Sequence, residues 1–197
     1  MHKTLYLIRH GVIRSNLEDV YAGRSPESLT DDGVVQAEQL GGVIEDWGIQ
    51  AIYSSPLRRT LQTAQILNRY CKADLSIDGD LNEIDLGRWT GLSKPEVSAR
   101  YPAEYRVWVS NPEQFREDGI ENLGQVQHRV LRAAGRFMQP DQPQTAAFVT
   151  HAVAVKLLVL HYRGLPMNLY HKIEVPNLSV YQVTLHGREG ASVERLK

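Results

Sequence analysis

Short apolar runs alternate along this chain with amphipathic segments of helical period, and this alternation constrains the fold more than any other feature. Runs of β-favouring residues lie at 4–9, 51–53, 146–150 and 178–185, with a weaker one at 75–77. Segments with apolar residues three and four apart lie at 31–47, 57–71, 123–137 and 153–161. Because helices between parallel strands cover both faces of a sheet, the pattern predicts a three-layer α/β fold with a largely parallel central sheet.

Local signals refine these boundaries. Thr30 is expected to cap the first helix, since its hydroxyl can accept from a backbone N–H of the first turn. Pro56 is expected to begin the second helix, where a missing N–H costs nothing. Residues 11–29 have no clean period and are expected to form a loop, and residues 178–185 are expected to be the closing strand.

Length and composition indicate one globular domain over residues 1–197. The chain has 197 residues, of which 42% are hydrophobic and 23% charged, which excludes disorder and collagen-like repeats. Residues 91–118 differ, with three prolines, four aromatic side chains and many charges. We expect short helices there, in an excursion that is either a lid over a site or a plain packing insertion.

The near-zero net charge excludes partners that bind through a strong electrostatic field. Twenty-two basic and 23 acidic residues give a net charge of −1, which attracts neither nucleic acid nor anionic lipid. The single cysteine, Cys71, excludes an intramolecular disulfide and a cysteine-rich zinc site. The first residues meet charge too soon for a signal peptide, and no apolar run is long enough to span a membrane, so the cytoplasm is the expected compartment.

Chemically reactive side chains follow the predicted strands at the points where these end. The segments are Arg9-His10-Gly11, Ser54 to Arg59, Leu81-Asn82-Glu83 and Thr150-His151-Ala152. The carboxyl ends of parallel strands meet at one edge of a sheet, where ligands bind. Histidines and arginines converging there would suit a small multiply charged anion, phosphate above all. A salt-bridge network of Arg9, Arg59 and Glu83 remains an alternative at this point.

The order of several motifs adds a resemblance to a known family. Leu7-Ile8-Arg9-His10-Gly11 with Asn16 resembles R-H-G-x-x-x-x-N, and Ser55 to Arg59 with Thr63-Ala64 resembles S-P-L-x-R-x-x-x-T-A. Leu29 to Gly33 with Gln36-Ala37, Leu81 to Gly91, Val149-Thr150-His151 and Asn177-Leu178-Ser179 also match in order. This set resembles the histidine phosphatase superfamily, also called phosphoglycerate-mutase-like, from residue 5 to about residue 183.

The resemblance implies a role for each matching position. His10 corresponds to the nucleophile that becomes phosphohistidine, and Glu83 to the proton donor. Arg9, Arg59 and His151 correspond to the phosphate clamp. Two further phosphate contacts are implied, from the Asn16 side chain and the Ala152 backbone N–H. No metal and no organic cofactor is implied, and the sequence has no H-E-x-x-H motif.

The chemistry sets requirements on these groups. His10 must attack as neutral imidazole, with Nδ1 donating to a backbone carbonyl. His151 is expected to be protonated. Glu83 must hold a proton near neutral pH, which burial favours and the neighbouring arginines oppose; the sequence does not decide between them.

Some positions depart from the family pattern or lack a fixed role. Val12 and Ile13 replace a Glu and a hydroxyl residue, and Ser15 is the candidate to supply the missing hydroxyl. Within the excursion, basic residues could contact a second anion and aromatic ones could line an apolar pocket or join the core: Lys94, Arg100, Arg106 and Arg116, and Tyr105, Trp108 and Phe115. Arg58, at a variable position of the family, is expected at the surface or just behind the residues that contact phosphate. Glu121 resembles the glutamate of a family G-E-S motif, which implies that it supports the site.

The resulting functional prediction is a metal-independent phosphomonoesterase that hydrolyses a small phosphorylated metabolite through a phosphohistidine intermediate. A phosphoglycerate mutase is the closest alternative, although mutases of the family are longer and have a larger basic lid. A non-catalytic phospho-ligand-binding protein is the alternative from another class. Retention of Glu83 argues against it, because a binding protein needs no proton donor.

Overall fold

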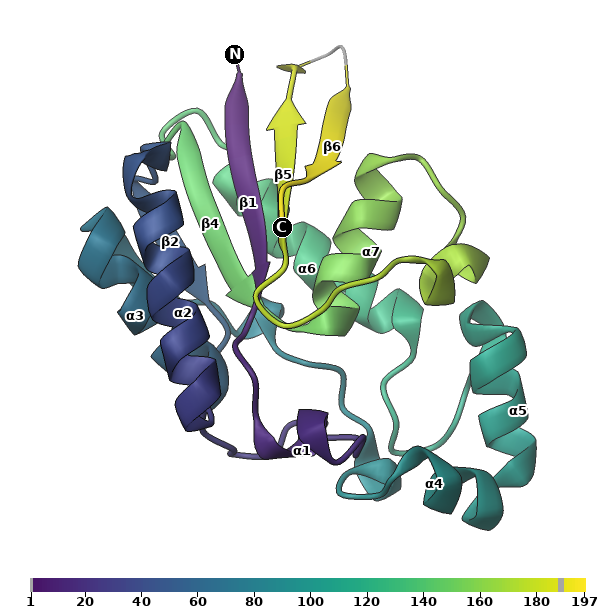
Figure 1. The fold of residues 1–197 in the computed structure, drawn as a ribbon. Coiled ribbons are helices and arrows are strands. Elements are labelled where there is room, and N and C mark those ends of the chain that lie inside the picture. The colour runs from purple at the N-terminus through teal and green to yellow at the C-terminus, as the bar shows by residue number, and fades with distance from the viewer. Residues whose placement is uncertain (1, 188–189) are drawn as a thin grey trace.

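A computed structural model describes residues 2–187 and 190–197 of the chain. In this part of the chain a sheet of six strands has the order β3-β2-β4-β1-β5-β6 (Figure 1). The strands are β1 (Lys3–Arg9), β2 (Ala51–Ser54), β3 (Asp74–Ile77), β4 (Thr145–Thr150), β5 (Val180–Leu185) and β6 (Ala191–Arg195). The first four run parallel, β5 pairs antiparallel with β1, and β6 pairs antiparallel with β5. The predicted largely parallel sheet is confirmed.

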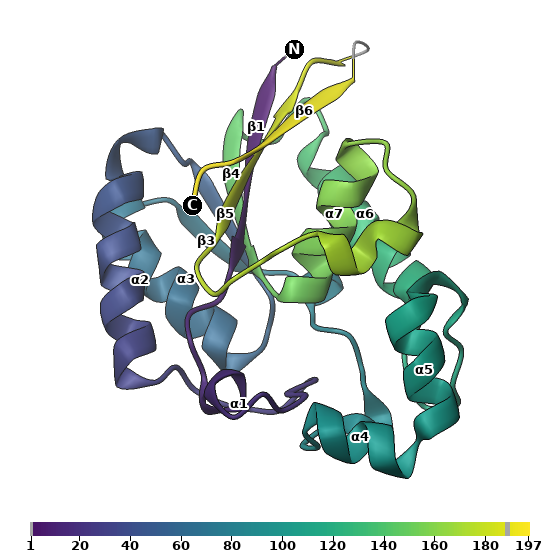
Figure 2. The ribbon, with the colours of Figure 1, turned by 45° about the vertical axis from the view of Figure 1, so that its right-hand side comes forward.

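Helices cover both faces of this sheet, as predicted (Figure 2). On one face lie α2 (Asp31–Ile44) and α3 (Arg58–Cys71), and on the other α6 (Leu123–Phe137) and α7 (Ala152–Tyr162). Successive residues of a strand point to opposite faces. In β1, Tyr6 and Ile8 therefore pack under α2 and α3, whereas Leu5 and Leu7 pack under α6 and α7. The sheet is buried on both sides and fixes where its strands end.

Several boundaries differ from the sequence prediction. The Thr30 cap is confirmed, since its hydroxyl accepts from Gly33 N–H at 3.0 Å. Pro56 lies before the helix instead of beginning it, because the N-cap of α3 is Leu57. The strand predicted from 178 begins at Val180, since Leu178 has a φ of 56° that strands do not adopt. The region predicted as loop contains a short helix, α1 (Arg14–Leu17).

Strand β6 was not predicted because it carries little apolar signal. Its residues are exposed or half-buried, as suits a strand at the edge of the described sheet that pairs with β5. Short 3-10 helices complete the chain as described: η1 (Glu45–Trp47), η2 (Gly79–Leu81), η3 (Gly87–Trp89), η4 (Pro112–Gln114) and η5 (Met167–Lys172).

The excursion at residues 91–118 packs onto the core. It contains α4 (Lys94–Arg100) and α5 (Pro102–Ser110), which lie beyond the α6 and α7 side of the sheet (Figures 1 and 2). Phe115 and Trp108 are buried and contact the fully buried Trp89, with ring centroids 5.2 and 6.3 Å away. Most of its aromatic surface therefore belongs to the core, although Trp108 also reaches a cavity described below.

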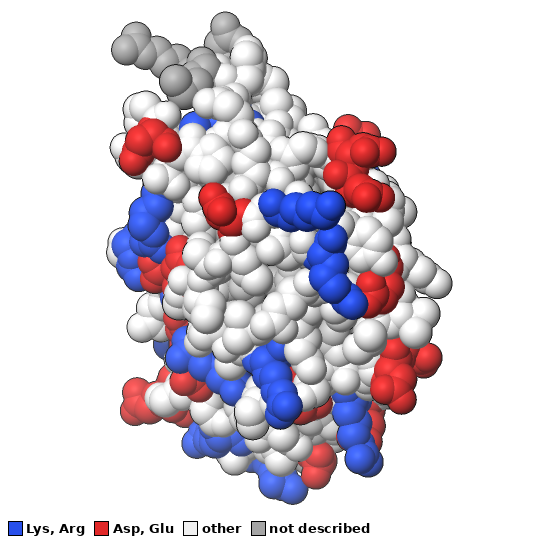
Figure 3. Space-filling view, turned by 90° about the vertical axis from the view of Figure 1, so that its left-hand side faces the viewer, with Lys and Arg blue, Asp and Glu red and all other residues white. Residues whose placement is uncertain are grey.

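The surface agrees with the near-zero net charge. The face in Figure 3 carries lysine and arginine side chains interspersed with aspartate and glutamate. Among the residues that the structure describes, no helix is both long and apolar enough to cross a membrane.

We expect Lys3→Met to lower the free energy of unfolding by about 2 kcal/mol, because hydrogen bonds from charged groups contribute on this scale. The Lys3 ammonium is buried and lies within 2.7 to 3.2 Å of four backbone carbonyls, those of Phe137, Gln139, Gln142 and Pro143. Methionine leaves these acceptors without their donor. Denaturant unfolding measures the loss, with the exposed Lys172→Met as control. Equal stability of the two variants would contradict this role of Lys3.

Candidate active site

A cavity of about 250 Å³ opens beyond the carboxyl ends of β1 and β4. Six of the seven residues singled out from the sequence line it: Arg9, His10, Asn16, Arg59, Glu83 and Ala152. The seventh, His151, is fully buried, and its ring centroid lies 5.2 Å from that of His10. Parallel strands that end at one edge thus bring together side chains far apart in the sequence.

The geometry at His10 fixes its tautomer. Its Nδ1 lies 2.7 Å from the Gly11 carbonyl oxygen, and a carbonyl can only accept, so Nδ1 carries the proton and Nε2 the lone pair. Burial lowers the pKa of His10 well below its usual value, and the charges of Arg9 and Arg59 lower it further. The expected neutral imidazole with a carbonyl at Nδ1 is confirmed.

Asn177 secures the loop that carries His10. Its Nδ2 lies 3.0 Å from the His10 carbonyl oxygen, 3.2 Å from that of Gly11 and 2.9 Å from Asn16 Oδ1. The sequence matched Asn177 to a family motif without giving it a role. Leu178, with its φ of 56°, turns the chain beside it, and its N–H donates to the Arg9 carbonyl. That strained turn follows from tertiary contacts and has no local sequence signal.

Two arginines place positive charge in the cavity without a contacting carboxylate. Arg9 donates to the Val175 carbonyl at 2.7 Å, and Arg59 donates to the carbonyls of Gly23 and Ser25 at 2.7 and 2.8 Å. In the described part of the chain, none of the ion pairs within 4.0 Å includes Arg9, Arg59 or Glu83. The Nε groups of both arginines are buried and unpartnered. The salt-bridge alternative is therefore wrong, and the guanidinium groups remain available to an anion.

His151 differs from the expectation in its charge. Burial, Arg59 and His10 hold the pKa of His151 well below its usual value, which favours a neutral ring without a bound anion, whereas the protonated ring was expected beside a phosphoryl group. Its Nε2 lies 2.7 Å from the hydroxyl of Ser55, a residue quoted in the S-P-L motif but not predicted to contact it. The Nδ1 of His151 is buried without a partner. A bound dianion would favour the protonated ring by its opposite charge.

The sequence left open whether burial or the neighbouring arginines dominate the pKa of Glu83. Burial raises the pKa of the Glu83 carboxyl above its usual value, and the opposing effects of Arg59, the Ile84 N–H and Arg9 are smaller. Its Oε1 accepts from the Ile84 N–H at 2.9 Å, which fixes the side chain. Asp85, the other nearby carboxylate, accepts from the Gly87 N–H instead and does not line the cavity.

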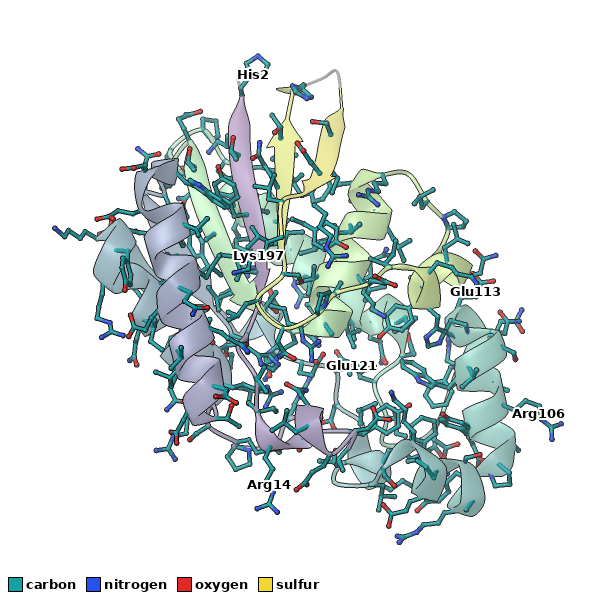
Figure 4. The ribbon with its side chains drawn as sticks, viewed as in Figure 1. His2, Arg14, Arg106, Glu113, Glu121 and Lys197 are labelled. Atoms are coloured by element: carbon teal, nitrogen blue, oxygen red, sulfur yellow. The ribbon has the colours of Figure 1, made fainter. Side chains whose placement is uncertain are left out.

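Glu121 supports the site through Arg129. Glu121, labelled in Figure 4, accepts from Arg129 Nε at 2.8 Å and Nη2 at 2.9 Å. Arg129 in turn donates to the carbonyls of Asn82 and Glu83. The expectation that Glu121 supports the site fits this chain of contacts, which anchors the backbone that carries Glu83.

Ser15 does not supply a hydroxyl to the cavity. Its Oγ donates to Glu27 Oε1 at 2.5 Å, its N–H donates to Glu27 Oε2 at 3.0 Å, and it does not line the cavity. Ile13 is fully buried and Arg58 is exposed. The candidate role for Ser15 was wrong, because one short α1 turn directs its side chain toward Glu27.

Only one of the four basic residues proposed for the excursion reaches the cavity. Lys94 lines it and pairs with Asp19 at 2.6 Å. Arg100 pairs with Glu96, and Arg116 donates to backbone carbonyls. Arg106 points away from the body of the protein (Figure 4). The remaining wall is mostly apolar, with Tyr21, Trp108 and Tyr170 beside aliphatic side chains such as those of Ile84 and Leu86.

The arrangement suits phosphate chemistry. Among residues 2–187 and 190–197, no cluster of three or more His, Cys, Asp or Glu side chains is placed to hold a metal ion. The cavity presents cationic donors and a neutral imidazole lone pair, with a carboxyl whose pKa is raised. The Ala152 N–H opens α7 and lacks a partner within the helix, as first-turn N–H groups do.

Comparisons with known proteins agree with this geometry. A family model described as "Histidine phosphatase superfamily (branch 1)" matches residues 5–196. A curated relative from Salmonella newport, named "Probable phosphoglycerate mutase GpmB", is 31% identical over 182 residues, covering 91% of this chain and 83% of its own.

Two solved structures are similar over nearly the whole chain. Bacillus stearothermophilus YhfR is 28% identical with a TM-score of 0.91, covering 98% of this chain and 96% of that one. The alpha-ribazole phosphatase from Shigella flexneri is 23% identical with a TM-score of 0.87, covering 98% and 95%. The second likeness concerns the fold alone.

Proposed function

The chain belongs to the histidine phosphatase superfamily, and from this premise we propose that it is a phosphomonoesterase for a small phosphorylated metabolite, working through a phosphohistidine at His10. One observation carries the proposal: a buried His10 with a free Nε2 lone pair faces a cavity holding two arginines that no carboxylate contacts. A neutral imidazole is a competent nucleophile toward phosphorus, and uncompensated arginines bind phosphate oxygens.

The proposed reaction has two steps. His10 Nε2 attacks phosphorus, the bond to the ester oxygen breaks, and Glu83 gives its proton to the leaving alkoxide. Ionised Glu83 then takes a proton from water, whose oxygen attacks the phosphohistidine and releases inorganic phosphate. Arg9, Arg59 and His151 offset the charge on the phosphoryl oxygens during both transfers.

Further contacts complete the proposed phosphate site. The Asn16 side chain and the Ala152 N–H are assigned as phosphate ligands, and both line the cavity. We assign residues 1–197 to one domain in which residues 91–118 act as the lid. The lid role is supported by Lys94 and Trp108, which line the cavity from α4 and α5.

A phosphoglycerate mutase is the second candidate, favoured by the name of the 31% identical relatives. Mutases of the family have a larger basic lid, whereas Lys94 is the one basic residue of segment 91–118 found to line this cavity. Incubation of 3-phosphoglycerate with a bisphosphate primer distinguishes the two. A hydrolase releases inorganic phosphate, whereas a mutase interconverts the 2- and 3-phospho isomers.

A non-catalytic phosphate-binding protein is the alternative from another class. It requires no carboxyl with a raised pKa beside the nucleophile, and Glu83 is such a group. Turnover of p-nitrophenyl phosphate tests this alternative directly, since a binding protein would leave the ester intact.

Phosphatase activity is expected to survive removal of divalent metals. The proposed transition-state charge is offset by Arg9 and Arg59, so no step needs a Lewis acid. Dialysis against a strong chelator should change kcat/KM by less than about twofold, which is within the scatter of such an assay. Loss of activity that is restored only by adding a metal ion would contradict the proposed clamp.

A further inference from the structure

Lys156 is a cation that the proposed phosphate chemistry does not use. It lies on α7, four residues after Ala152 and three after Val153, both of which line the cavity. Residues at these spacings share one face of a helix, and helical side chains lean toward the helix N-terminus. The Lys156 side chain is therefore on the cavity side of α7 and leans toward the end where the cavity lies.

Tyr170 joins the Lys156 ammonium to the cavity wall. Lys156 Nζ lies 4.6 Å from the centroid of the Tyr170 ring, and Tyr170 lines the cavity with only 4% of its surface exposed. A cation over a phenol ring is held there by the ring's negative face. The half-buried ammonium thus has a fixed place against Tyr170, a residue of the cavity wall, although Lys156 itself does not line the cavity.

No carboxylate neutralises this ammonium by contact. In the described part of the chain no ion pair within 4.0 Å includes Lys156, and Glu174, whose charge raises the pKa of Lys156 slightly, pairs with Arg195 at 3.7 Å. Burial is the main cause that lowers the pKa of Lys156, followed by the charge of Arg9, with Glu83 opposing. A half-buried cation without a contacting anion is costly unless a ligand supplies one.

A charge balance indicates what that ligand carries. A phosphoryl dianion takes up the charges of Arg9 and Arg59 and favours the protonated form of His151, so these three cations all serve the phosphoryl group. Glu83 is neutral when it acts as the acid, and Lys94 is already paired with Asp19 at 2.6 Å. One positive charge, that of Lys156, then remains for a group on the leaving side of the substrate.

We propose that Lys156 is a specificity-determining residue that holds a second anionic group on the leaving-group side of the phosphate ester. The substrate class is therefore a small phosphorylated acid, whose carboxylate or second phosphate accepts from the Lys156 ammonium. This proposal rests on the phosphomonoesterase function proposed above.

The test uses two substrates that differ in one charge. 3-Phosphoglycerate carries a carboxylate where glycerol 3-phosphate carries a neutral hydroxymethyl group. Wild-type protein should show a higher kcat/KM for the acid. Lys156→Met should lower kcat/KM for the acid by about 10- to 100-fold, the scale of one charged hydrogen bond, and change the value for glycerol 3-phosphate less than threefold.

Matched variants separate charge from folding. Lys156→Arg keeps the charge and should retain most of the preference for the acid, and Arg106→Met, on the outward face of α5, should leave it unchanged. An unchanged substrate ratio in Lys156→Met, with glycerol 3-phosphate still hydrolysed, would overturn the role of Lys156 and leave the phosphatase function standing. If the wild-type protein hydrolyses p-nitrophenyl phosphate but neither of these two esters, the role of Lys156 falls and the phosphatase function stands. If it hydrolyses none of the three, both proposals fall.

Discussion

The His10→Ala variant is expected to lose phosphatase activity by about 10⁵-fold or more, the scale on which removal of the nucleophile acts in other covalent enzymes. His10 is the group whose lone pair faces the cavity, and the neighbouring imidazole of His151 directs Nε2 to Ser55 instead. Initial rates with p-nitrophenyl phosphate measure the loss, because its good leaving group makes the assay sensitive.

Binding should survive this substitution. Arg9 and Arg59 are anchored by the backbone carbonyls of Val175, Gly23 and Ser25, none of which depends on the His10 ring. His10→Ala should therefore bind inorganic phosphate or vanadate within about tenfold of the wild type, a difference of about 1.4 kcal/mol. Retained turnover in a variant that still binds phosphate would remove His10 from the nucleophile role.

The Glu83→Gln variant is expected to slow esters of poor leaving groups by about 10²- to 10⁴-fold, the usual contribution of a positioned general acid. The phenolate of p-nitrophenyl phosphate leaves largely without a proton, so that substrate should slow far less. Arg59→Ala should slow both substrates alike, because it stabilises phosphoryl charge whatever group leaves. Equal slowing of both substrates in Glu83→Gln would contradict the acid role.

The pH dependence gives a second measure of Glu83. Its pKa is raised by burial, so the protonated acid persists above the usual range and is lost as the pH rises through that pKa. The pKa of His10 is lowered, so the neutral nucleophile is lost only on acidification below the usual range. A bell-shaped profile should result for alkyl esters, and its alkaline limb should disappear in Glu83→Gln.

Much of the fold was accessible from the sequence because its signals are local. The apolar period of α6, with Val126, Val130 and Phe137 buried, and the Thr30 cap of α2 specify their elements within a few residues. Strand β6 was missed, because an exposed edge strand has almost no apolar pattern. Where the chain reverses at Leu178, only tertiary contacts determine the backbone.

The sequence predicted which residues form the site but not their protonation states. Strand ends and the ordered motifs placed Arg9, His10 and Glu83 at one edge. Protonation was beyond reach of the sequence, since it depends on how burial and neighbouring arginines balance in three dimensions: the pKa of Glu83 is raised, whereas that of His151 is lowered. The contact between Ser55 and His151 joins residues 96 positions apart and has no local signature.

The most direct test of the proposed mechanism is to identify the bond that holds phosphorus to the protein during turnover. Wild-type protein mixed with a ³²P-labelled ester and quenched without acid should carry a label at His10 that is stable to alkali and lost in acid, as expected for a phosphorus–nitrogen bond. His10→Ala should carry none. A label that survives acid, or one that remains in full on His10→Ala, would contradict the phosphohistidine mechanism.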